Sequence, residues 1–281
     1  MFAGSRQFQV PAAAQRPALS AFVHYPCERA SAATPFGPYE LDVSVDAPLA
    51  PGRFALVLVS HGSGGAPLLY RSVSLLLARS GYIVALLKHP GNSLGDNALA
   101  DSPQNLRSRP RHLVALLDAL LADPQLGGSI SEAPVTVIGH SMGGFTALSL
   151  AGGQPWTRSG QRIDVVQDPR IGALVLLAPA CGWFLAPGAL RHVTARILAL
   201  TAEHDDLTPD REVRTALAGV PNQAAVTIET IPNAGHFSFL APFPRAMRNP
   251  GFAPALDPAG FDRERFHRQF PQRVLDWLGG A

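Results

Sequence analysis

Residues 135–144 read VTVIGHSMGG, and this stretch decides the fold. Its first four residues are apolar or β-branched, as in a buried strand, and the apolar run after the serine ends at Gly152-Gly153, as a buried helix would. Ser141 has a glycine two positions before it and another two positions after it. Glycines at these positions let a strand and a helix approach closely around a sharp turn. The stretch therefore predicts a nucleophile elbow, a turn that exposes the hydroxyl of Ser141 for chemistry.

The alternation of strand and helix extends along the chain from residue 54. We expect strands at 54–60, 82–87, 135–138, 173–178, 197–201 and 224–231, and helices at 68–79, 106–121, 210–217 and 261–278. Shorter extended segments precede them at 7–10, 19–25 and 39–45. This order predicts an α/β fold, a mostly parallel sheet with helices on both faces and an antiparallel N-terminal edge. Because no repeat or linker divides residues 1–281, we expect a single domain.

Composition excludes several function classes. The 23 basic and 21 acidic residues leave a net charge of +2 without a long single-sign run, so we expect no nucleic-acid partner. The densest basic segment, residues 107–111, is interpreted as a solvated helix start. The uncharged run at 171–190 is broken by prolines and glycines, so we expect no transmembrane segment. The N-terminus has no apolar signal region, which favours a cytoplasmic location but leaves an exported mature form open.

The two cysteines, Cys27 and Cys181, are isolated and show neither metal-ligand nor redox spacing. We expect free buried thiols. The His, Asp and Glu residues are not spaced as metal ligands either. We therefore expect neither a metal ion nor another cofactor.

A serine hydroxyl needs a general base, and the base needs a group that holds its orientation. Asp205 lies in the loop after the expected strand at 197–201, and the adjacent Asp206 is the alternative acid. His236 lies in the loop after the last expected strand and follows a glycine. The order of serine, acid and histidine is the one that accompanies a nucleophile elbow. We predict a triad of Ser141, Asp205 and His236.

Acyl transfer also needs backbone N–H groups that stabilise the negative oxygen of the transition state. One candidate is the amide of Met142, at the start of the elbow helix. The other comes from residues 60–65, which read SHGSGG after the strand at 54–60. The amide of Ser63 is the first choice there and that of Gly62 the second.

Together these motifs resemble the α/β-hydrolase superfamily. Residues 89–92 (HPGN) and 109–112 (RPRH) further resemble the predicted dienelactone-hydrolase-like esterases related to platelet-activating-factor acetylhydrolase. The resemblance covers about residues 53–240. Dienelactone hydrolases proper use a cysteine nucleophile, whereas residue 141 is serine. The resemblance therefore implies hydrolysis of ordinary carboxylic esters rather than opening of a dienelactone ring.

Only 18 residues separate the expected strands at 173–178 and 197–201, which leaves no room for a large cap there. We expect a small-molecule ester with an apolar acyl or alkoxy group, bound by Met142, Trp183, Phe237 and Phe239. Cleavage of thioesters or amides, acyl transfer by the same triad, and a non-catalytic binding role remain alternatives. The sequence gives no indication of the oligomeric state.

Overall fold

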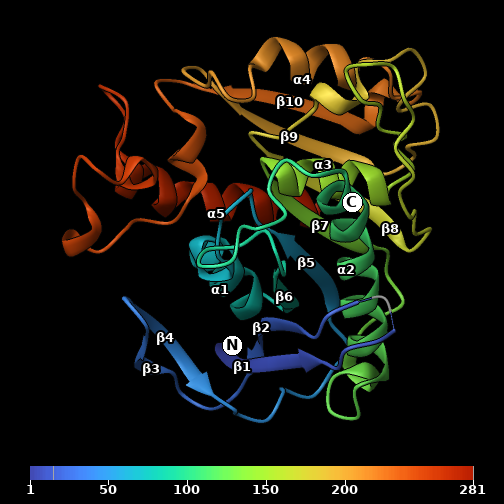
Figure 1. The fold of residues 1–281 in the computed structure, drawn as a ribbon. Coiled ribbons are helices and arrows are strands. Elements are labelled where there is room, and N and C mark those ends of the chain that lie inside the picture. The colour runs from blue at the N-terminus through green and yellow to red at the C-terminus, as the bar shows by residue number, and fades with distance from the viewer. Residues whose placement is uncertain (15, 281) are drawn as a thin grey trace.

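The computed structural model describes residues 1–14 and 16–280. Their strands form a sheet in the order β10-β9-β8-β7-β5-β6-β2-β1-β4-β3 (Figure 1). The strands are β1 (Phe2–Val10), β2 (Leu19–Cys27), β3 (Ala32–Phe36), β4 (Tyr39–Val45), β5 (Ala55–Ser60), β6 (Tyr82–Lys88), β7 (Val135–His140), β8 (Ile171–Leu177), β9 (Arg196–Ala202) and β10 (Val226–Ile231). The α-helices are α1 (Arg71–Arg79), α2 (Pro103–Ala122), α3 (Met142–Leu150), α4 (Asp210–Leu217) and α5 (Arg263–Gly279).

The sheet has a parallel part and a mixed part. From β10 to β6 each neighbouring pair of strands is parallel. Strand β2 then pairs antiparallel with β6 and with β1. This arrangement confirms the predicted mostly parallel sheet with an antiparallel N-terminal edge.

Helices cover both faces of the sheet, and each face has its own apolar core. Helices α1 and α5 pack on one face, where Leu77 and Val274 are fully buried. Helices α2, α3 and α4 contribute to the core on the other face, with Leu113 and Phe145 fully buried. Every residue of the central strand β7 is buried, as expected of a strand covered on both faces.

Several element boundaries differ from those expected from sequence. Helix α2 begins at Pro103 because the Ser102 hydroxyl caps it by accepting a hydrogen bond from the Asn105 amide. The segment expected as one helix at 68–79 contains a 3₁₀ turn, Pro67–Tyr70, before α1. A second 3₁₀ turn at Gln223–Ala225 delays the start of β10 to Val226. Strand β1 starts five residues earlier than expected, and β3 was not predicted.

The loops that follow β5, β7, β9 and β10 all leave the same edge of the sheet, because the strands are parallel. Between β8 and β9 the chain forms only a short 3₁₀ turn, Gly182–Phe184, so the predicted absence of a large cap there is confirmed. The long connection between β10 and α5 projects from the body of the molecule (Figure 1). No helix within residues 1–14 and 16–280 is both long and apolar enough to cross a lipid bilayer.

Candidate active site

Ser141 lies at the turn between β7 and α3, with backbone angles φ 53° and ψ −119°. These angles are rare for a residue with a side chain and mark stored backbone strain. The two flanking glycines explain how the turn closes. A Cβ atom on Gly139 would lie 2.2 Å from the carbonyl oxygen of Gly143, and a Cβ atom on Gly143 would lie 1.8 Å from that of Ser60. Only glycine fits at these two positions, so the local geometry is that of a nucleophile elbow.

Asp205 and His236 form a buried pair at the carboxyl ends of β9 and β10. The Nδ1 atom of His236 lies 2.8 Å from Oδ2 of Asp205. The other carboxylate oxygen of Asp205 accepts hydrogen bonds from the amides of Leu207 and Thr208, each over 2.9 Å. Burial raises the pKa of Asp205, but the hydrogen bonds from His236 and Thr208 outweigh it and leave the pKa below its ordinary value. The carboxylate is therefore held in its charged form against the imidazole.

The hydroxyl of Thr208 joins this pair. It lies 2.8 Å from Oδ2 of Asp205, 3.2 Å from Nδ1 of His236 and 3.0 Å from the carbonyl oxygen of Ala178. No pattern in the sequence singles out Thr208. Asp206, the alternative acid, is exposed and lies outside these contacts.

Ser141 and His236 line the same cavity, which has a volume of about 220 Å³. Among the described residues the two side chains are not joined by a hydrogen bond, and such bonds are often long before a substrate binds. The glycine-rich loop after β5, with Gly62 and Ser63, forms another part of the wall. The rest of the wall is mostly apolar: Leu69, Leu94, Leu207, Phe237, Leu240, Phe243, Met247 and Phe252.

Of the four residues expected to bind the apolar group, only Phe237 lines this cavity. Phe239 is completely buried and packs against Phe266 and Phe270, so it belongs to the core. Trp183 packs edge-on against Phe145 on the other face of the sheet. Met142 packs against the same core as Trp183. The expectation for these three side chains is therefore corrected.

The amides of Ser63 and Met142 are free to bind a substrate oxygen, since neither donates a hydrogen bond to another described residue. The hydroxyl of Ser63 is fixed by Asn92, whose Nδ2 donates to it over 2.9 Å. The amide of Gly62, by contrast, donates to the Tyr70 hydroxyl over 3.3 Å. Because that amide already has a partner, the structure favours Ser63, the first choice, over Gly62, and both assignments stay predictions.

A chain of buried hydrogen bonds connects the glycine-rich loop with His236. The Tyr70 hydroxyl accepts from the Gly62 amide and lies 3.0 Å from Nδ1 of His140. Nε2 of His140 lies 2.9 Å from the backbone carbonyl oxygen of His236, so Nε2 carries the proton. Burial lowers the pKa of His140 to about 3, which keeps its ring neutral. The neutral ring of His140 therefore connects the Tyr70 hydroxyl with the backbone of His236 by hydrogen bonds.

Arg109 is completely buried, which corrects the interpretation of residues 107–111 as a solvated helix start. Its neighbours Arg107 and Arg111 are exposed, as that interpretation required, but Arg109 points beneath the glycine-rich loop and donates to the carbonyl oxygen of His61. Sequence could have indicated this only through the helical periodicity, because position 109 lies on the same helix face as the buried residues 105, 112 and 113.

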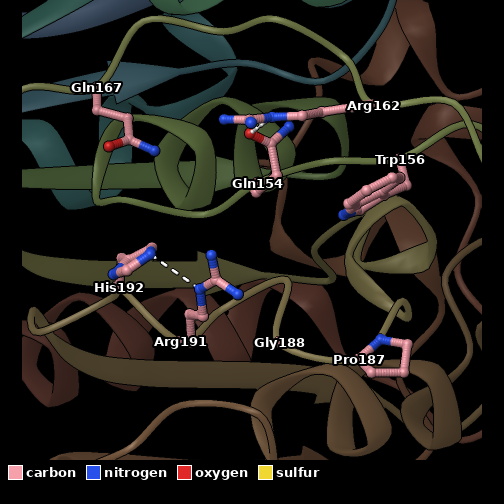
Figure 2. A pocket seen from close by; sticks show the side chains of 8 residues that line it. All are labelled: Gln154, Trp156, Arg162, Gln167, Pro187, Gly188, Arg191 and His192. Carbon is pink, nitrogen blue, oxygen red and sulfur yellow. Dashed lines mark hydrogen bonds between the residues drawn. The ribbon is translucent and has the colours of Figure 1, made fainter.

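A second cavity of about 320 Å³ lies elsewhere, between the segments 154–167 and 187–192 (Figure 2). Figure 2 shows Arg162 hydrogen-bonded to Gln154, and Arg191 hydrogen-bonded to His192. Neither arginine forms an ion pair with a described carboxylate. The described residues in its wall include no serine, cysteine or carboxylate, so this cavity lacks the nucleophile and the acid that the predicted triad needs.

Comparison with known proteins identifies the family of this fold. The model of the alpha/beta hydrolase family matches residues 56–222, more than half of the chain. The chain belongs to this family. It is also 24% identical over 170 residues to the platelet-activating factor acetylhydrolase of Cavia porcellus, a match that covers 46% of this chain and 39% of that protein. The chain thus matches well under half the length of that relative.

Solved structures resemble the alpha/beta hydrolase over nearly its whole length. A ferulic acid esterase from Streptomyces cinnamoneus aligns with a TM-score of 0.68 and 18% identity, covering 97% of this chain and 87% of the esterase. A putative dienelactone hydrolase from Klebsiella pneumoniae aligns with a TM-score of 0.60 and 16% identity over 99% of both chains. A dienelactone hydrolase from Anabaena variabilis gives 0.55 and 18%, over 95% of this chain and 96% of the other. At these identities the likeness establishes the fold.

Proposed function

We propose that this alpha/beta hydrolase is a serine carboxylesterase and that its 281 residues act as one domain. The observation that carries the proposal is the buried Asp205–His236 pair, whose His236 lines the same cavity as Ser141 in its strained turn. Membership of the hydrolase family and the likeness to esterases and dienelactone hydrolases support hydrolysis of an ester.

In the first half of the reaction the hydroxyl oxygen of Ser141 attacks the ester carbonyl carbon, and His236 accepts the hydroxyl proton. Asp205 holds Nδ1 of His236 so that the other ring nitrogen is available as the base. The amides of Ser63 and Met142 donate to the negative oxygen of the tetrahedral intermediate, and donors of this kind contribute about 3–4 kcal/mol each. His236 then returns the proton to the departing alcohol, which leaves an acyl-enzyme on Ser141.

Water completes the cycle by the same chemistry. His236 removes a proton from the water while the oxygen attacks the acyl carbon, and the same two amides stabilise the second tetrahedral intermediate. His236 protonates the Ser141 oxygen as it departs, and the carboxylic acid is released. No metal or redox group takes part in these steps.

The cavity favours an ester with a small apolar group. Its wall is largely aliphatic and aromatic, and its volume of about 220 Å³ lies below the roughly 300 Å³ at which pockets for drug-sized ligands begin. We therefore propose short or medium acyl or alkoxy chains as the natural substrate class.

The test is hydrolysis of p-nitrophenyl esters, from acetate to decanoate, by the wild-type protein and by Ser141→Ala. Circular dichroism must show that both are folded. We expect the variant to lose the activity by at least a thousandfold and the wild type to prefer the shorter chains. Equal rates for the two proteins would refute the serine mechanism. Activity on thioester or amide analogues alone would instead assign the triad to those reactions.

A further inference from the structure

Arg109 on helix α2 is an unusual buried charge. Its side chain has no exposed surface, and no described carboxylate forms an ion pair with it. Burial lowers its pKa to about 9, so the guanidinium still carries its proton at neutral pH. A buried charge without an opposite charge normally costs several kcal/mol. Arg109 therefore places a positive charge without an ion-pair partner among the described residues beneath the candidate active site.

The donors of Arg109 reach both segments that carry the two free amides. On the side of the glycine-rich loop, the guanidinium donates to the carbonyl oxygen of His61 and to the Ser60 hydroxyl, the latter over 3.2 Å. It also donates over 2.6 Å to Oδ1 of Asn92, the residue whose Nδ2 binds the hydroxyl of Ser63. Arg109 is therefore one side chain away from Ser63.

On the side of the elbow helix, Nε of Arg109 donates to the hydroxyl of Thr146 over 3.1 Å. That hydroxyl in turn donates to the carbonyl oxygen of Met142 over 2.9 Å. Arg109 is thus one side chain away from Met142 as well. A single planar guanidinium ties the two segments together, and its fixed fork of donors sets their separation.

The ionisable groups around Arg109 are neutral. Burial, reinforced by the charge of Arg109, lowers the pKa of His61 to about 3, that of His112 to about 4 and that of His89 well below its ordinary value. Burial also raises the pKa of Tyr70, which keeps its hydroxyl protonated. The positive charge of Arg109 is therefore not balanced by an ionised neighbour among these groups.

We propose that Arg109 is a positioning residue of the oxyanion hole: it holds the Ser63 and Met142 amides at the spacing that binds one oxygen, and its unbalanced charge favours the negative oxygen of the transition state. This inference rests on the proposed esterase function. Because the negative charge exists only in the tetrahedral intermediates, the effect of Arg109 belongs to kcat rather than to substrate binding.

The first experiment measures kcat and KM for p-nitrophenyl acetate, together with thermal unfolding, in Arg109→Met, Arg109→Lys and the control Arg111→Met. Arg111 lies two residues along the same helix and is exposed. We expect kcat to fall about 10- to 100-fold in Arg109→Met, part of the 10²–10³ that one oxyanion donor contributes, with KM within about twofold. Lysine keeps the positive charge but lacks the planar set of donors of the guanidinium, so Arg109→Lys should have a kcat between those of the wild type and Arg109→Met. The control should match the wild type.

A lower melting temperature with kcat unchanged in both Arg109 variants would overturn the proposal, since it would assign Arg109 to packing alone. If Arg109→Met does not fold, the ratio of kcat values for Arg109→Lys and the wild type decides the same question.

A second readout does not depend on activity. Hydrogen–deuterium exchange, followed by mass spectrometry, is compared between the wild type and Arg109→Lys for peptides that contain residues 60–66 and 141–147. We expect faster exchange in both peptides and unchanged exchange in β9. Unchanged exchange in both peptides would refute the positioning role. If Ser141→Ala keeps full ester activity, the proposed function fails, whereas this exchange result still reports whether Arg109 holds the two segments.

Discussion

His140 binds the backbone of His236: its Nε2 donates to the carbonyl oxygen of His236 over 2.9 Å. His140 is the residue directly before Ser141, so one hydrogen bond links the turn of the proposed nucleophile to the segment of the proposed base. The same ring contacts the Tyr70 hydroxyl, which accepts a hydrogen bond from the Gly62 amide. Three loops that are distant in sequence are therefore fixed relative to one another by neutral side chains.

Replacing His140 with leucine should lower kcat between ten- and a hundredfold with little change in KM. The variant loses the donor to His236 and the acceptor for Tyr70, and small displacements of a catalytic group cost this much. Steady-state kinetics on p-nitrophenyl acetate measure the effect. His204→Leu, at an exposed position, is the control. Wild-type kcat in His140→Leu would show that the hydrogen bond does not position the base.

Asp205→Asn should reduce kcat by about 10³–10⁴, because an amide cannot hold the charged imidazole that forms during the reaction. Asp206→Asn is the matched control, since it changes the adjacent exposed acid. We expect it to retain at least half of the wild-type activity in the same p-nitrophenyl ester assay. A large loss in Asp206→Asn with a small one in Asp205→Asn would reverse the assignment of the acid.

Gly143→Ala should destabilise the protein by at least about 3 kcal/mol, the upper end of ordinary overpacking, because the new Cβ would lie 1.8 Å from the carbonyl oxygen of Ser60. The contact is with backbone, which has little freedom to move. Gly128→Ala is the control, because nothing lies within 4 Å of a Cβ there. Urea denaturation measures both. Equal midpoints for the two variants would mean that the turn is looser than described.

The protein should lose stability as the pH falls below about 6.5. Burial is the main cause that lowers the pKa values of His24, His61 and His140 to about 3, whereas in the unfolded chain they titrate near 6.5. Between those values the unfolded state binds more protons, so each such histidine removes up to about 1.4 kcal/mol per pH unit. Melting temperatures from pH 7.5 to 5 measure the slope. His24→Gln should make it shallower, and an identical slope would contradict the assignment.

Met247→Trp should shift the preference toward shorter acyl chains, because it adds bulk to the cavity wall. We expect the ratio of kcat/KM for octanoate to that for acetate to fall at least tenfold, as one methylene changes recognition in an apolar pocket by about 1–3 kcal/mol. Trp183→Ala, which lies away from the cavity, should leave this ratio unchanged. A changed ratio in Trp183→Ala would indicate that Trp183 lines the substrate site.

The sequence was sufficient to predict the proposed triad because each member follows a strand of a parallel sheet. Ser141, Asp205 and His236 are far apart in the chain, yet the carboxyl ends of β7, β9 and β10 bring them to one edge. The strand patterns and the glycine spacing around Ser141 were enough to predict these three positions. Their roles in catalysis remain predictions that the experiments above test.

Side-chain direction within loops could not be predicted. Phe237 and Phe239 lie two residues apart in one 3₁₀ turn, His236–Phe239, and only the structure separates the one in the cavity from the one in the core. Contacts between distant polar residues were equally hidden. Tyr70 meets His140 across 70 positions, and Arg109 reaches Thr146 across 37, with no local pattern to indicate either partner.

Phe243, Met247 and Phe252 line the cavity, and they follow His236 along the chain without an intervening strand or α-helix. The connection between β10 and α5 therefore carries both the proposed base and part of the cavity wall, and between them the Ala241 amide donates to the carbonyl oxygen of Leu69. This hydrogen bond separates the backbone of His236 from the wall residues that follow it. We therefore expect substitutions at these three wall positions to change the substrate range with less effect on turnover than substitutions at residues 236–240.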